Sequence, residues 1–161
     1  MTAARAQTTV DYTIGIGIFL VAVTFTFAFV PTIFTPFVGT GNEYPQTANR
    51  IADRLADDAL AGSTTRPSVL NETCTAGFFD ADGSAPAGCA FEQDASDLNA
   101  AVGVAGVRSV NVTITTDGDL TTVDGTLLAA GPDVPPKANA VAASRIVLID
   151  GDDHLLKVRV W

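Results

Sequence analysis

The chain begins with one long apolar region and then changes its pattern several times. Residues 12–42 carry no charged side chain, and residues 14–30 are almost wholly apolar. A helix over residues 10–30 would span roughly 30 Å, the hydrocarbon thickness of a membrane. It lacks the polar face of a soluble helix, since its threonine hydroxyls can bond back to the helix backbone. The pattern predicts a transmembrane helix over residues 7–31, against the alternative of a buried helix in a soluble protein.

Two later segments have the period of an amphipathic helix. Residues 47–60 repeat apolar side chains at helical spacing, with charged side chains opposite. Pro45 before this segment and Gly62 after it favour a helix with these limits, lying on a sheet. Residues 96–102 predict a second, short helix capped by Ser96. Residues 32–46 are rich in proline and glycine and predict a bent linker that starts where Pro31 ends the first helix.

The last third of the chain changes to the period of strands. Residues 107–116 alternate apolar and polar side chains and predict a half-buried strand. Residues 117–119 predict a turn, followed by short strands at 120–123 and 125–128. Residues 143–149 and 155–161 predict a hairpin around the turn 150–153, with Leu156, Val158 and Val160 facing inward. We therefore expect an α+β domain over residues 47–161, with one or two helices packed on a small antiparallel sheet.

Charge limits the partners of this domain. The chain has 9 Lys plus Arg against 18 Asp plus Glu, with Asp far more frequent than Glu, and lysine only at Lys137 and Lys157. An acidic, lysine-poor surface keeps a protein soluble where salt screens charge over short distances, which is typical of a halophilic source. The same net charge argues against nucleic acid or an anionic membrane surface as a partner of the domain. Lipid around the apolar helix is the expected membrane contact.

The two cysteines, Cys74 and Cys89, flank a segment rich in turn-forming residues. A pair of this kind beyond a membrane anchor predicts a disulfide in an oxidising exterior, closing a loop over residues 75–88. Redox or metal use fits less well, because the chain has no CxxC motif and no histidine nearby. Residues 80–83, Asp-Ala-Asp-Gly, lack the later ligands of a calcium loop and predict a turn. We expect no metal and no cofactor.

Catalytic motifs are absent from the sequence. It contains no GxSxG, no glycine-rich phosphate loop and no HExxH. The one histidine, His154, lies beside a predicted hairpin turn, where a surface residue is far more common than a base or a ligand. The aspartates are explained by a solvated acidic surface. We therefore expect no catalytic residue and no enzyme activity.

Two sequons for N-glycosylation occur, Asn71-Glu72-Thr73 and Asn111-Val112-Thr113. Asn111 falls on the predicted polar face of its strand, from which a glycan would project, and Asn71 falls in a loop before the disulfide. The alternative is that both are plain polar surface residues.

The residues before the apolar helix carry a further signal. Arg5 and Ala6 precede the apolar run, Gln7 follows them, and Asp11 lies where the run begins. A secretory signal peptide has its small-residue cleavage site after the apolar run instead. The arrangement resembles the class III signal of type IV pilins and archaellins, in which a prepilin peptidase cuts before the helix. With the acidic composition, the chain resembles small pilin-like membrane proteins of haloarchaea.

This resemblance implies a removable leader over residues 1–6 and a mature chain that begins at Gln7. In a filament core the new α-amino group would be a charge in an apolar setting, and the Asp11 carboxylate of a neighbouring subunit would neutralise it. Negative charge also suits the start of a helix. The alternative is a plain signal-anchor, in which Arg5 is a positive-inside residue and Asp11 marks the membrane edge.

Three classes of function follow from these patterns. The first is a structural cell-surface protein, a minor pilin-like subunit that assembles through its helix with other pilin-like subunits. The second is a monomeric, membrane-anchored binding or adhesion domain, and the third, a surface enzyme, has no site in the sequence. In the first two the protein is single-pass, with a cytoplasmic N-terminus and an extracellular C-terminal domain.

Overall fold

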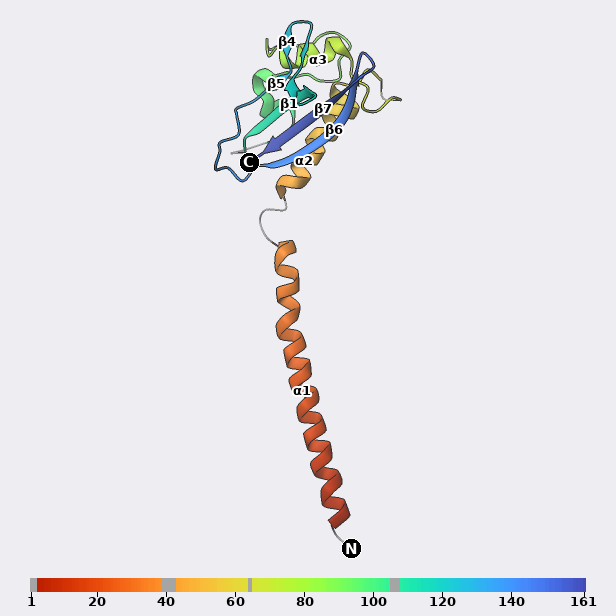
Figure 1. The fold of residues 1–161 in the computed structure, drawn as a ribbon, viewed down its shortest axis with the longest axis vertical. Helices are drawn as coiled ribbons and strands as arrows, with labels where there is room; N and C mark the ends of the chain where they lie inside the picture. Colours follow the sequence, from red (N-terminus) through yellow and green to blue (C-terminus); the bar gives the residue numbers. More distant parts are fainter. Residues whose placement is uncertain (1–2, 39–42, 64, 105–107) are drawn as a thin grey trace. The chain divides into compact units, whose positions relative to one another are not determined.

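The computed structural model describes residues 3–38, 43–63, 65–104 and 108–161. It divides into two units, Met1–Asn42 and Glu43–Trp161, which are treated separately below. The first unit contains helix α1, and the second contains the β-strands and the remaining helices (Figure 1). The chain is thus α+β, with an apolar helix near its N-terminus followed by an antiparallel sheet with helices.

Helix α1 runs over Ala3–Val38 and contains the apolar stretch Val10–Val30. The predicted end of this helix at Pro31 is wrong, because the helix continues through Pro31 and Pro36. A proline inside a helix removes one backbone hydrogen bond and crowds the preceding turn, yet apolar helices tolerate it when neighbouring groups keep the backbone paired. The predicted linker over residues 32–46 is shorter as a result, since the next helix begins at Glu43.

Helix α2, Glu43–Arg54, continues into one π-helical turn, η1, Leu55–Ala59. The predicted amphipathic helix is therefore present, but it begins four residues before the predicted Thr47. Pro45 falls in the first turn, where its missing N–H would have had no partner in the helix. The side of α2 and η1 that is buried carries Ala48, Ile51, Ala52, Leu55, Ala56 and Ala59.

The main sheet has the strand order β2-β1-β7-β6, and β5 also pairs with β1. Its long strands are β1 (Val110–Thr116), β6 (Val141–Ile149) and β7 (Asp152–Val160), and its short ones are β2 (Asp119–Leu120) and β5 (Ala129–Ala130). All of these pairings are antiparallel. A separate two-stranded ladder joins β3 (Thr122–Val123) to β4 (Thr126–Leu127). The predicted hairpin is confirmed as β6–β7, but the predicted turn 150–153 is too long, because β7 already begins at Asp152.

Asp-Gly pairs form the tight turns of these hairpins. Asp150 and Gly151 both have positive φ, 52° and 89°, and they alone separate the paired residues Ile149 and Asp152. Positive φ at both central residues is the type I′ geometry, whose twist matches that of the flanking strands. Asp117-Gly118 and Asp124-Gly125 have the same signs of φ. Register in the sheet is thus fixed locally by two residues at each turn.

One face of the sheet forms the core. Val110 pairs with Val160, Val112 with Val158 and Ile114 with Leu156, and all six side chains are buried. Helix α2 packs against β6 and β7 and covers this face (Figure 1). The guanidinium of Arg145 on β6 ties the two layers together, because its Nε lies 2.7 Å from Oδ1 of Asp53 on α2. The predicted packing of a helix on one face of the sheet is confirmed.

Helix α3, Glu72–Phe79, occupies a segment that the sequence predicts to be loop. The Phe78 ring packs edge-on against Phe79 and Phe91, with ring centroids 5.3 and 5.4 Å apart. The predicted helix over residues 96–102 is split into a 3-10 turn, η2 (Ala95–Asp97), and a short helix, α4 (Leu98–Ala101). Asp94 and Asp97 cap these two elements, so the predicted cap at Ser96 is wrong.

Candidate functional site

Within helix α1, the stretch Val10–Val30 has apolar side chains on every side. Phe19, Phe25 and Phe27 are exposed by 63%, 63% and 72%, and none of the stretch Val10–Val30 is buried inside the protein. Two of its threonines are satisfied locally, since the hydroxyls of Thr24 and Thr26 donate to the Leu20 and Ala22 carbonyls at 2.8 Å. By length and composition this stretch is sufficient to cross a membrane.

The predicted processing residues lie at the start of the same helix. Arg5, Ala6 and Gln7 fall within α1, and their side chains are outside the described residues. Asp11 has an exposed side chain and lies eight residues after Ala3, more than two turns into α1. Its negative charge can therefore stabilise the start of the helix only if residues 1–6 are removed. The cut itself stays a prediction.

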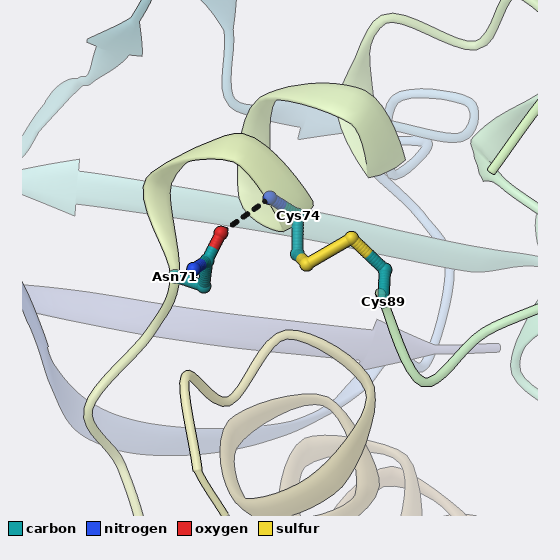
Figure 2. The surroundings of a disulfide bond; sticks show 3 residues. All are labelled: Asn71, Cys74 and Cys89. Carbon is teal, nitrogen blue, oxygen red and sulfur yellow. Dashed lines mark hydrogen bonds between the residues drawn. A yellow bond between two sulfur atoms is a disulfide. The ribbon is translucent and has the colours of Figure 1, made fainter. Parts of the chain in front are cut away.

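Cys74 and Cys89 form a disulfide, with Cα atoms 5.5 Å apart (Figure 2). Cys74 is in the first turn of α3, and its backbone N–H donates to Oδ1 of Asn71 at 2.9 Å. Asn71 is the N-cap of α3, so the cap and the covalent bond hold the same turn. Pro86 packs on Gly77 of α3 so closely that a Cβ there would overlap the proline ring. The closed segment is thus partly helical and packed.

The two sequons lie in different environments. Asn71 is exposed, and its cap uses Oδ1, whereas a glycan attaches through Nδ2. Capping of α3 and glycosylation of Asn71 are therefore compatible. Whether Asn71 carries a glycan stays a prediction.

Asn111 is only 5% exposed, so its predicted position on an open polar face is wrong. Its Nδ2 donates to the Ala130 carbonyl at 3.3 Å, and its Oδ1 accepts from Arg159 Nη1 at 2.9 Å. Both ends of the amide are used inside the domain, between β1, β5 and β7. Its burial and these two bonds make Asn111 a structural residue of the folded domain.

A buried carboxylate organises the loop that follows α3. The Asp94 side chain is 2% exposed, and its Oδ2 accepts from the Gly83 N–H at 2.6 Å. Its Oδ1 accepts from the Ser96 N–H at 2.9 Å and from the Ser96 hydroxyl. Burial raises the pKa of Asp94, but hydrogen bonds from Ser96, Gly83 and Ser84 lower it by more, so its pKa is below the usual 3.8.

Asp80 and Asp82 lie beside Asp94, with ligand oxygens of the three residues within 4.8 Å of one another. Asp80 Oδ1 accepts from the Asp82 N–H at 3.3 Å, and Asp82 Oδ1 accepts from the Ser84 N–H at 2.8 Å. These bonds close successive turns of the loop, and Asp94 joins the loop to η2. The three carboxylates thus have a structural role in holding this loop.

His154 takes part in a bond across the sheet. Its Nδ1 is 2.6 Å from Oγ1 of Thr116, and that hydroxyl is 2.7 Å from Oγ1 of Thr121. The three side chains link β7, the end of β1 and the residue before β3. These two hydrogen bonds hold the His154 side chain at the end of the sheet, which gives it a structural role.

An arginine groove lies beside α2, defined here by its lining residues Gln46, Thr47, Arg50 and Arg108. It is an open hollow of about 500 Å³. The Arg108 guanidinium stacks over the Tyr44 ring, 5.2 Å from its centroid. Arg54 lies one turn beyond Arg50, with its Nη1 3.4 Å from the place where a Cβ on Gly103 would be. Positive side chains therefore gather along one side of α2 in a chain that is acidic overall.

One family model matches residues 3–161. The chain belongs to the family of unknown function DUF7287. The match covers both α1 and the domain, so the family is defined by both parts together. No curated protein and no solved structure matches this DUF7287 chain significantly.

Sequence reasoning found α1 and the cysteine pair of this DUF7287 protein but missed the arginine groove. The net charge of the whole chain is negative, and it gives no information on a local cluster of positive side chains. The signal that was present is the spacing of Arg50 and Arg54, four residues apart in a predicted helix and therefore neighbours on its surface. Arg108 joins them from far along the chain, which only the fold reveals.

Proposed function

We propose that this protein is a structural cell-surface protein, a pilin-like subunit held in the membrane by α1, with the disulfide-bonded domain outside the cell. The observation that carries this proposal is the apolar stretch Val10–Val30, none of which is buried. Exposed apolar area in water is unfavourable by about 25 cal/mol per Å². Lipid, or the apolar helices of neighbouring subunits, would cover it.

The disulfide supports a location outside the cytoplasm. Cys74 and Cys89 join in the folded domain, and disulfides persist in oxidising compartments and are rare in reducing ones. The domain would therefore be translocated, while Arg5 stays on the cytoplasmic side, in keeping with the positive-inside rule. The acidic surface of the domain fits exposure to a salty medium, in keeping with a halophilic source.

The residues at the start of α1 favour a subunit over a simple anchor. A cut between Ala6 and Gln7 would leave Asp11 as the fifth residue, near a new α-amino group. Among packed helices the Asp11 carboxylate of one copy would neutralise the amino group of another. A monomeric anchor has no such use for it.

Asp11→Asn tests this proposal, because it keeps the shape and removes the charge. We expect unchanged cutting and membrane insertion, but less protein in sheared extracellular fibres and in crosslinked membrane oligomers. Losing one partner of a buried ion pair costs about 3–5 kcal/mol, which accounts for the reduced assembly. Asp133→Asn, in an exposed loop of the domain, is the matched control and should assemble as the wild type does.

The mature N-terminus should be read by mass spectrometry of protein from native membranes. A start at Gln7 supports the pilin-like subunit. An intact start at Met1 or Thr2, with no assembly of the wild type, would favour the anchored binding domain instead.

A further inference from the structure

We infer that the arginine groove, extended by Arg54, binds the phosphate groups of anionic membrane lipids. This inference rests on the proposed membrane anchoring of α1. It differs from the expectation from net charge, which argues against an anionic membrane surface as a partner.

The geometry places several guanidinium groups along one side of α2. Arg50 and Arg108 line the same groove, and Arg54 follows Arg50 at the i,i+4 spacing of neighbours on a helix surface. The Arg54 side chain extends to Gly103. The groove and its extension therefore present positive charge from Arg108 through Arg50 to Arg54.

Arg50 and Arg54 lie outside the ion pair that the domain forms with Asp53. Neither makes an ion pair with any residue that the structure describes. Asp53 on the same helix binds Arg145 at 2.7 Å, and Asp57 accepts from the Ser68 N–H at 3.1 Å. These two acids are therefore already bound to other groups. Arg50 and Arg54 have the same charge at i,i+4 spacing, and such pairs repel each other on a helix. An anion bound between the two arginines would remove that repulsion.

The chemistry of the groove fits phosphate. A guanidinium presents paired N–H donors that match two oxygens of one phosphate, and arginine is favoured wherever phosphate is bound in this way. Tyr44 is half-buried and carries the Arg108 guanidinium on its ring. Tyrosine is also a side chain typical of the membrane interface, where one end is apolar and the other polar.

The covalent chain supplies the reason to assign the phosphate to lipid. The last residue of α1 is Val38 and the first of α2 is Glu43, so five peptide links join them. Counted from Val30, the end of the apolar stretch, eight more helical residues add about 12 Å, and the link to α2 adds at most about 18 Å. A domain tethered so closely to a membrane-spanning helix meets headgroups at a high effective concentration, which free phosphate in the medium does not have.

The test uses the full chain in lipid nanodiscs, with phosphatidylcholine alone or mixed with phosphatidylglycerol. Hydrogen exchange of the α2 amides is read by mass spectrometry. We expect exchange to be slower by about fivefold in the anionic discs, since one Arg near an anionic surface shifts binding by about that factor. The double variant Arg50→Gln/Arg54→Gln should lose this difference. Arg66→Gln/Lys157→Gln removes the same charge elsewhere and should keep it.

Three results would overturn the inference. One is equal exchange in the two kinds of disc, and another is the same loss in both double variants. The third is an equal slowing by inorganic phosphate in phosphatidylcholine discs, which would assign the groove to a soluble anion. Failure of the protein to enter any disc would instead refute the membrane anchoring, so the two proposals fail in distinguishable ways.

Discussion

The apolar residues of α1 and those of the domain are of the same types, yet their environments are opposite. Ile18 on α1 is 66% exposed, whereas Ile114 on β1 is 0% exposed. In the domain the apolar residues alternate with polar ones, so they meet on one face of a sheet and are covered by α2. On α1 they run without interruption and leave no polar side. The pattern of apolar residues, more than their number, decides whether a segment encloses its own core or needs an external one.

Replacing glycine by alanine should affect the two regions very differently. One such change in the domain has the largest expected effect on the free energy of unfolding. Gly131 has φ +83°, and a Cβ there would overlap the carbonyl oxygen of Val110 and lie 2.8 Å from Cδ2 of Leu98. We expect Gly131→Ala to lower the free energy of unfolding by about 3–5 kcal/mol, from backbone strain and steric overlap together. Urea denaturation of the full chain in detergent, followed by fluorescence of the single tryptophan, Trp161, measures it.

Two controls separate the causes. Gly118 has φ +98° and nothing within 4 Å of its Cβ position, so Gly118→Ala should lose only about 1–2 kcal/mol. Gly15 on α1 also has nothing within 4 Å, and Gly15→Ala should leave the Trp161 transition unchanged. Similar losses from Gly131→Ala and Gly118→Ala would show that the neighbours of Gly131 move aside freely.

The second prediction concerns the disulfide, which acts only within the domain. The bond closes a sequence separation of 15 residues, so replacing Cys74 and Cys89 by alanine should lower the free energy of unfolding by about 3 kcal/mol. Hydrogen exchange should rise first in α3, whose first turn contains Cys74, and later in the β6–β7 hairpin. Helicity of α1 should not change. Earlier loss of protection in the hairpin would contradict this order.

The third prediction is a pH dependence from Asp94. Its pKa is lower in the folded protein than the usual 3.8, so its contribution to stability is complete above the unfolded pKa and is lost as pH falls through the folded one. At pH 7 we expect Asp94→Asn to lower the free energy of unfolding by about 2 kcal/mol, because charge-assisted hydrogen bonds are replaced. The difference from wild type should shrink below about pH 4. Asp133→Asn should show no such convergence.

The smallest expected effect is a gain. Thr75 on α3 is 0% exposed, and its hydroxyl has no hydrogen-bond partner among the residues that the structure describes. Thr75→Val keeps the shape and should raise the free energy of unfolding by up to about 1 kcal/mol. Thr113→Val is the matched control, because Thr113 Oγ1 accepts a hydrogen bond from Arg159 Nη1 at 3.5 Å. This variant loses that weak bond, so its stability should not rise. A loss from Thr75→Val would point to a partner for its hydroxyl.

The elements that the sequence predicts well are those whose signal is local. The β6–β7 hairpin follows from strict alternation around Asp150-Gly151, and both the period and the turn chemistry lie within one short segment. The amphipathic side of α2 is equally local. Its first residue was missed because Pro45 is read as a breaker before a helix, although the first turn accepts it.

Helix α3 could not be found in the same way. It contains Gly77 and no amphipathic period, and it is followed by residues that favour turns. What holds it is the Asn71 cap, the bond from Cys74 to Cys89 and the packing of Phe78 on Phe91. Each of these interactions involves a residue outside the helix. Two of those residues, Cys89 and Phe91, lie more than a turn beyond its end.

The two errors at site residues have the same physical origin. Alternation places Asn111 on the face opposite the core, but it does not reveal that Arg159, 48 residues later, reaches across and binds it. Composition likewise predicts an acidic surface and hides the meeting of Arg50 with Arg108. Both depend on contacts between distant strands and helices.

A mechanical consequence follows from the packing of α2. Tension along α1 would reach the domain at Glu43 and would have to pass through α2, which is attached to β6 and β7 by side-chain packing and by the pair of Arg145 with Asp53. The covalent bond from Cys74 to Cys89 lies later in the chain and does not join α2 to the sheet. It therefore adds nothing to the contact between α2 and the sheet. We expect the contact between α2 and the β6–β7 hairpin to be the first part of the domain that meets such tension.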